Sequence, residues 1–198
     1  MKHSLLLFLC LTSFCYSFAQ NTVSGSYVTK TNNTINAKII VPSSIFVAED
    51  LSKLFFKVKI VDSIKGAITL KPEDINSFEF LLNGKQYQFY AKPFNAKNNL
   101  RFLQSLVIGP KSSLYWAQTV NQNGAVVGTF YTFEKADGTY AFLINTMRLD
   151  KFKTELKEFY KDNLEAQQII DAKFQSKAVL HSDIIEILQT VNRITSKE

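Results

Sequence analysis

The fold class is decided by one stretch, Ser77-Phe78-Glu79-Phe80-Leu81-Leu82-Asn83-Gly84-Lys85-Gln86-Tyr87-Gln88-Phe89-Tyr90. Apolar and polar residues alternate on both sides of an Asn-Gly pair, which is the preferred connection of a two-residue β-hairpin because both turn positions need positive φ. The stretch therefore predicts two antiparallel strands at residues 77–82 and 85–90.

Further hairpins are predicted on both sides of this one. Asn32-Asn33 joins predicted strands at 26–30 and 35–41. Asn123-Gly124 joins strands at 113–120 and 126–134, and Asp137-Gly138 joins the second of these to a strand at 139–145. Period-two alternation predicts a strand at 54–61 with Phe56, Val58 and Ile60 on one face, and a turn at Lys65-Gly66 leads to another at 67–70. Residues 98–108 suit a short helix or a strand, and we favour the strand.

Helical spacing replaces alternation from Asp150 onward, a residue that can cap a helix. Three amphipathic segments follow: one around Phe152, Leu156 and Phe159, one around residues 164–174, and one from Ser182 to the end. Strands followed by helices indicate an α+β protein. We expect an antiparallel, hairpin-rich sheet of about eight to ten strands (residues 20–147), either a sandwich or a partly curled barrel, and two or three helices packed on it (148–198).

Residues 1–19 resemble a secretory signal peptide. Lys2 supplies a positive start, residues 5–9 with Phe14 form an apolar run, and Ser17 and Ala19 are small residues at the cleavage positions. A lipoprotein needs a small residue before its cysteine, but Leu9 and Phe14 precede Cys10 and Cys15. We therefore expect an exported, periplasmic or secreted protein, without a lipid anchor and with no transmembrane segment in the mature chain.

Cleavage would remove both cysteines and one of the two histidines, leaving His181. A cysteine-free exported chain cannot rely on disulfides, and a zinc site would need carboxylates almost alone. Its basic residues are mostly scattered lysines, whereas nucleic-acid readers concentrate lysine and arginine on one face. We expect no metal, no cofactor and no nucleic-acid partner.

Two groups of residues suggest catalysis but have simpler explanations. His181-Ser182-Asp183 is interpreted as a helix start, with Ser182 as the cap and His181 exposed before it, because adjacency alone does not build a catalytic triad. Glycosidases use two acids about 5 to 10 Å apart. The candidate acids for such a hydrolase are Glu73, Asp74, Glu79 and Glu134.

Aromatic residues occur on several consecutive predicted strands, and neighbours within each group point to opposite faces of a sheet. One aromatic row could form an exposed platform for a ligand or partner. The contact residues predicted for such a platform are Tyr115, Trp116 and Tyr131. The alternative is that helices cover one face and that cross-strand aromatic pairs stabilise the other.

Three stretches resemble an uncharacterised family of secreted proteins from Bacteroidetes-type bacteria: residues 70–80; residues 102–109 with Leu114-Tyr115; and the helical tail, from Tyr160-Lys161-Asp162 to Val191-Asn192. The ending of the leader, at residues 17–20, is also similar. Members often carry a cysteine soon after the aspartate of the first tail helix, whereas Asn163 follows Asp162 here. The resemblance covers roughly residues 24–194 and implies an envelope or secreted location, without an activity.

The sequence therefore predicts a non-catalytic binding or interaction module of the bacterial envelope, with a protein or a small apolar ligand as its partner. Two alternatives stay open. The first is a carrier of an apolar molecule such as a lipid, held between the sheet and the helices. The second is a carboxylate-dependent hydrolase. The oligomeric state does not follow from the sequence.

Overall fold

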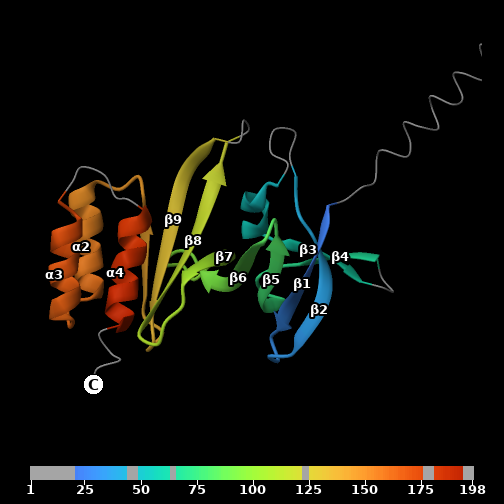
Figure 1. Cartoon of the computed structure of the whole chain (residues 1–198), viewed down its shortest axis with the longest axis horizontal. Coiled ribbons are helices and arrows are strands. Elements are labelled where there is room, and N and C mark those ends of the chain that lie inside the picture. The colour runs from blue at the N-terminus through green and yellow to red at the C-terminus, as the bar shows by residue number, and fades with distance from the viewer. Residues whose placement is uncertain (1–20, 44–48, 63–65, 122–124, 176–180, 194–198) are drawn as a thin grey trace, which may run out of the picture.

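The computed structural model describes residues 21–43, 49–62, 66–121, 125–175 and 181–193. The leader predicted at residues 1–19, Lys65 and the Asn123-Gly124 turn lie outside the described residues. Over the described ranges the chain forms an antiparallel sheet followed by three helices (Figure 1), which confirms the predicted fold class.

The sheet has ten strands: β1 (Thr22–Thr29), β2 (Thr34–Ile40), β3 (Val58–Asp62), β4 (Gly66–Leu70), β5 (Ile75–Leu82), β6 (Lys85–Pro93), β7 (Leu100–Val107), β8 (Ser112–Val120), β9 (Val126–Lys135) and β10 (Tyr140–Ile144). Their order is β10-β9-β8-β7-β6-β5-β1-β2-β3-β4, and each neighbouring pair is antiparallel. The sheet does not close into a barrel, so β10 and β4 are its two edges.

The Asn-Gly hairpin forms as predicted. Leu82 pairs with Lys85, and Asn83 and Gly84 have φ angles of 52° and 76°, the left-handed values that this turn requires. Within residues 98–108, Leu100–Val107 form β7, so the strand interpretation of that segment is confirmed.

The strand predicted at 54–61 begins only at Val58. Leu54 and Phe55 instead belong to a 3₁₀ helix, η2 (Leu51–Phe55), and Phe56, predicted to face the core, is 56% exposed. Leu54 and Phe55 enter two different apolar clusters. A helical turn directs consecutive side chains about 120° apart and so permits this division.

The helices are α2 (Leu149–Phe159), α3 (Leu164–Lys173) and α4 (His181–Arg193). The predicted cap at Asp150 is wrong, because α2 begins one residue earlier, and the Asp150 carboxylate forms an exposed ion pair with Arg148 at 3.8 Å. Ser182 is also not a cap, since α4 already includes His181. Asn163 caps α3 by accepting a hydrogen bond from the Ala166 amide at 2.9 Å.

Two large apolar cores lie along the sheet. The first, here called the sheet core, forms where the first strands and η2 pack on one another, and consists of Ile39, Val41, Leu54, Val58, Ile60, Ile75, Phe78, Phe80, Leu82, Phe89 and Phe102. The second, the helix core, consists of Leu114, Tyr131, Phe133, Leu143, Phe152, Leu156, Phe159, Tyr160, Ala166, Ile170, Phe174, Ile184, Ile187, Leu188 and Val191.

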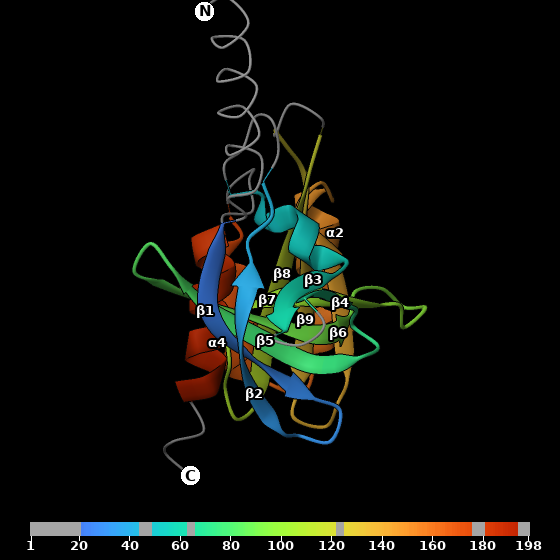
Figure 2. The ribbon, with the colours of Figure 1, turned by 90° about the vertical axis from the view of Figure 1, so that its right-hand side faces the viewer.

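The helices gather at one end of the sheet, and β1–β4 form the other end (Figures 1 and 2). Helix α2 packs on β10, α4 packs on β8 and β7, and α3 packs on both helices as an outer layer. On the opposite face of the sheet the end of β6 crosses β9, where the Thr132 hydroxyl donates to the Pro93 carbonyl at 3.2 Å. The end of β6 therefore covers part of β9 on the face away from the helices.

Candidate functional site

The three predicted contact residues do not form one exposed platform. Trp116 and Tyr131 are direct cross-strand partners on the face that the helices cover, whereas Tyr115 points to the opposite face. Tyr115 and Tyr131 are each only 4% exposed. Tyr115 packs with Phe55 and Leu103 where η2 and the sheet meet. Of the three residues, Trp116 alone is partly accessible to solvent.

Trp116 lies against the first residue of α4. Its ring centre is 4.7 Å from that of His181, and the Tyr131 hydroxyl shares a hydrogen bond of 3.0 Å with His181 Nδ1. Burial lowers the pKa of His181 and raises the pKa of Tyr131 to about 12. Both groups are therefore neutral near pH 7. His181 is half-buried rather than exposed as predicted, because its ring packs on Trp116.

Trp116 also stands between the two cores. A single cross-strand ladder runs from Phe78 through Phe89, Gln104 and Trp116 to Tyr131. Phe78 and Phe89 belong to the sheet core and Tyr131 to the helix core. Gln104 thus breaks a row of aromatic rings at the point where one core ends and the other begins.

A cavity of about 300 Å³ lies at this junction, which makes it the candidate site. Strands β6–β9 and the segment at residues 49–55 line it; the lining residues are Glu49, Asp50, Leu51, Ser52, Phe55, Phe89, Phe102, Gln104, Trp116, Ala117, Gln118, Val120 and Val126. Its walls are mostly apolar, with a few polar groups among them, which is the usual composition of a small-molecule site.

The polar groups of this cavity divide into those with partners and those without. The Glu49 carboxylate accepts from the Asn83 side chain at 3.0 Å, and the Asp50 carboxylate accepts from Ser52 Oγ at 2.5 Å. The Trp116 indole N–H is buried and has no acceptor within the described part of the chain. A buried donor without a partner is costly, so an acceptor supplied by a ligand would stabilise it.

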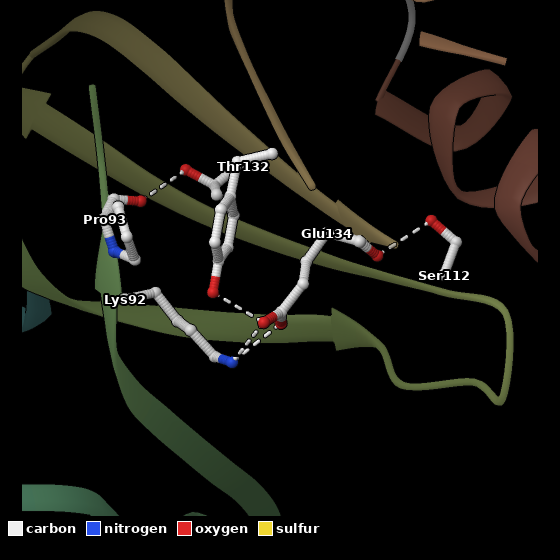
Figure 3. A network of polar contacts seen from close by, with 6 residues as sticks. Lys92, Pro93, Ser112, Thr132 and Glu134 are labelled. Atoms are coloured by element: carbon white, nitrogen blue, oxygen red, sulfur yellow. Dashed lines mark hydrogen bonds and ion pairs between the residues drawn. The ribbon is translucent and has the colours of Figure 1, made fainter. Parts of the chain in front are cut away.

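A second polar cluster surrounds Glu134 on the other face (Figure 3). Lys92 Nζ contacts the two Glu134 carboxylate oxygens at 2.8 and 2.7 Å, and the Tyr140 hydroxyl donates to the same carboxylate at 2.6 Å. Lys92 comes from β6, which crosses β9 here. The cluster therefore fastens the end of β6 over β9.

The pKa values of the acidic groups in this cluster are shifted away from neutral pH. Burial opposes ionisation of Glu134, but the Lys92 ammonium and the Tyr140 hydroxyl together lower its pKa below the ordinary value. Burial and the Glu134 charge raise the pKa values of Tyr115 and Tyr140. A general acid or base works best with a pKa near the working pH, so these shifts oppose a catalytic role for Glu134.

The other candidate acids are engaged in turns and strand pairing. Glu79 accepts from Ser26 at 3.2 Å and from Gln88 at 2.8 Å, both on adjacent strands. The Asp74 carboxylate accepts from the Lys71 amide at 2.7 Å within a turn, and Glu73 is exposed beside it. His181, Ser182 and Asp183 follow one another on α4, where consecutive side chains do not face each other.

Sequence reasoning missed Asn192, Gln104 and Gln118. Asn192 Oδ1 accepts from the Lys111 and Ser112 amides at 3.2 and 3.1 Å, and its Nδ2 donates to the Ser112 carbonyl at 2.9 Å, so that it fastens α4 to the start of β8. Gly109 leaves room for this side chain, since a Cβ there would lie 2.2 Å from it. No local pattern marks any of the three, because the partners of Asn192 and the other walls of the cavity that Gln104 and Gln118 line are far away in the sequence.

The chain matches no known family, no curated protein and no solved structure. None of the helices in the described ranges is long and apolar enough to cross a membrane. The described residues also contain no group of three or more histidine, cysteine, aspartate or glutamate side chains that could hold a metal ion. The resemblance to secreted Bacteroidetes-type proteins stays a prediction.

Proposed function

We propose that this protein is an exported, non-catalytic binding module that receives a small neutral ligand group in the cavity at Trp116. The observation that carries the proposal is the buried indole N–H without an acceptor, on a residue that lines a cavity of about 300 Å³. The leader-like segment at residues 1–19 supports export to the bacterial envelope.

The cavity lining indicates the class of ligand. Its carboxylates already accept hydrogen bonds, and the side-chain amides of Gln104 and Gln118 have no partner within the described ranges. Primary amides both donate and accept, the indole only donates, and Phe89 and Phe102 offer apolar ring surface. These groups suit one neutral ring that carries hydroxyl or amide groups, such as a sugar unit. The volume lies at the small end of ligand pockets, which argues against a long-chain lipid.

Fluorescence of the single tryptophan offers a direct test, since Trp116 itself lines the site. The mature chain would be titrated with glucose, galactose and N-acetylglucosamine as sugar probes and with laurate as an apolar probe. We expect a saturable change in emission with at least one sugar. Saturation by laurate alone would favour the carrier alternative instead.

Two substitutions separate binding from stability. Gln118→Leu keeps the size of the side chain but removes its hydrogen-bonding groups, so we expect about tenfold weaker sugar binding with little change in melting temperature. Tyr115→Phe, on the opposite face, is the matched control and should bind normally. The proposal fails if no sugar probe binds, or if Gln118→Leu and Tyr115→Phe bind the sugar equally well.

A further inference from the structure

We propose that the edge strand β10 is a docking site for an extended segment of a partner polypeptide, which would add to the sheet as an eleventh strand. The inference is independent of the Trp116 cavity. It rests on the hydrogen-bonding groups of β10, on the groove around the strand, and on the position of α2.

The unpaired backbone groups of β10 follow from its register. Lys135 N–H donates to the Thr139 carbonyl and Asn145 N–H donates to the Thr129 carbonyl, at 2.9 and 3.0 Å. Hydrogen-bonded pairs alternate along an antiparallel ladder, so Ala141 and Leu143 also bond toward β9. The N–H and C=O groups of Tyr140 and Phe142 therefore point away from the sheet, and no described residue pairs with them.

The sequence of β10 lacks the usual protection of an edge strand. Natural edges are often blocked by lysine, proline or a bulge. Strand β10 is Tyr-Ala-Phe-Leu-Ile, all of them residues without charge, and its pairing with β9 is regular from Tyr140 to Ile144. A row of backbone donors and acceptors is thus presented on an uncharged strand, which is the arrangement used for recognition by strand addition.

A groove of about 720 Å³ surrounds this edge. It is lined by all five residues of β10, by Phe94–Ala96 and Phe130 on one face, and by Glu155, Glu158, Phe159 and Lys161 near the other. The Phe94 and Phe130 ring centres are 6.1 Å apart, and the Tyr140 and Phe142 rings stack at the same distance. The added strand should carry apolar side chains on the face that meets these four rings.

The position of α2 decides between a peptide and a second copy of this chain. Helix α4 packs on β8 and α2 packs on β10. These strands are separated by β9 and so lie about 10 Å apart, a distance that suits two neighbouring helices. Pairing of β10 with β10 of a second copy would place two α2 helices over neighbouring strands, about 5 Å apart, which is too close. The edge therefore suits an isolated extended segment that carries no helix on that face.

A labelled peptide, Lys-Thr-Tyr-Ala-Phe-Leu-Ile-Asn-Lys, serves as the probe, since it copies residues 139–145 between two solubilising lysines and brings no helix. Fluorescence anisotropy with the mature chain should show saturable binding. Only every second residue of the probe forms backbone hydrogen bonds with the edge. N-methylation of the amides of those residues should therefore abolish binding, and N-methylation of the alternate amides should leave the affinity unchanged.

Two substitutions at one position give the matched control in the protein. Phe142→Ala and Phe142→Pro both remove the ring, but only proline also removes the outward N–H. We expect Phe142→Pro to bind the peptide about tenfold more weakly than Phe142→Ala, with similar melting temperatures.

Several results would overturn the inference. These are the absence of saturable peptide binding, equal binding of the two methylated peptides, and equal affinity of Phe142→Pro and Phe142→Ala. Sedimentation supplies the remaining test. A wild-type dimer that Phe142→Pro dissociates would show that a second copy occupies the edge instead.

Discussion

The aromatic rings of the sheet core and those of the helix core pack with different geometries. In the sheet core, the Phe78 and Phe89 rings lie in register across one hairpin and stack at 4.9 Å with an interplanar angle of 8°. In the helix core the rings meet mostly edge-on, as Phe152 and Phe174 do at 5.7 Å and 75°. The first core is built from neighbouring strands, and the second needs three helices from the end of the chain.

The difference shows how the candidate site arises. Strand register aligns aromatic residues on one face of the sheet, but neither core extends over Gln104 and the cavity beside it. Trp116 packs at the margin of the helix core and lines that cavity. The site is therefore a consequence of two cores that share a sheet without merging.

The largest expected effect comes from breaking the sheet core. Phe78 is 1% exposed and contacts the rings of Phe80, Phe89 and Phe102. Phe78→Ala should lower the free energy of unfolding by about 3 to 5 kcal/mol, because it removes a buried ring and leaves a cavity. Urea unfolding followed by Trp116 fluorescence and by circular dichroism should shift equally for both signals. Separate transitions would mean that the two cores unfold independently.

The attachment of α4 is the next test, on the helix-core side. Asn192→Ala leaves the Lys111 and Ser112 amides without their acceptor, so we expect a loss of about 1 to 3 kcal/mol in unfolding free energy. Asn192→Asp keeps an acceptor for both amides but places a carboxylate oxygen beside the Ser112 carbonyl in place of the donor, so it should recover only part of the loss. Chemical denaturation of the two variants would contradict this account if aspartate were as damaging as alanine.

A smaller effect is expected at the start of α3, in the outer layer. Asn163→Ala removes the cap on the Ala166 amide and should cost about 1 kcal/mol. Asn163→Asp retains an acceptor at the same place and should be close to wild type in thermal melts. A loss larger than that of Asn192→Ala would show that α3 matters more to the helix core than its outer position suggests.

The smallest expected effect is a pH dependence at the junction of the cores. Burial lowers the pKa of His181 in the folded chain below the ordinary value of about 6.5, so the unfolded chain binds the proton more tightly. The contribution of His181 to stability is therefore complete above pH 6.5 and declines as the pH falls through the lower folded pKa. Melting temperatures measured between pH 8 and pH 5 should show this decline, and His181→Gln should reduce it. An unchanged pH profile in that variant would contradict the assignment.

Local patterns were sufficient for most of the sheet. Asn83-Gly84 and Asp137-Gly138 produced the expected hairpins because turn conformation depends on neighbouring residues alone. The pattern failed at Phe56, where alternation continued but η2 interrupted the strand. It also failed at Asp150, whose acidic side chain suits the first turn of a helix as well as a cap.

The candidate site was only partly predictable for the same reason. The aromatic strands predict Trp116 as a contact residue, but the sequence also predicts an exposed His181 and an open surface that includes Tyr131. In the structure the His181 ring packs on Trp116 and Tyr131 is buried. His181 meets Tyr131 and Trp116 here, 50 and 65 positions away in the sequence. No periodicity in a strand or a helix encodes a contact of that kind.

The sequence by itself determined the hairpins, the strand order within each hairpin and the change from strands to helices, because turn chemistry and hydrophobic period act over a few residues. Tertiary structure alone decided which face α2 and α4 cover, how β6 crosses β9, and where the cavity at Trp116 forms. These depend on contacts between distant residues such as Asn192 with Ser112 and Lys92 with Glu134, which exist only after strands and helices have packed together.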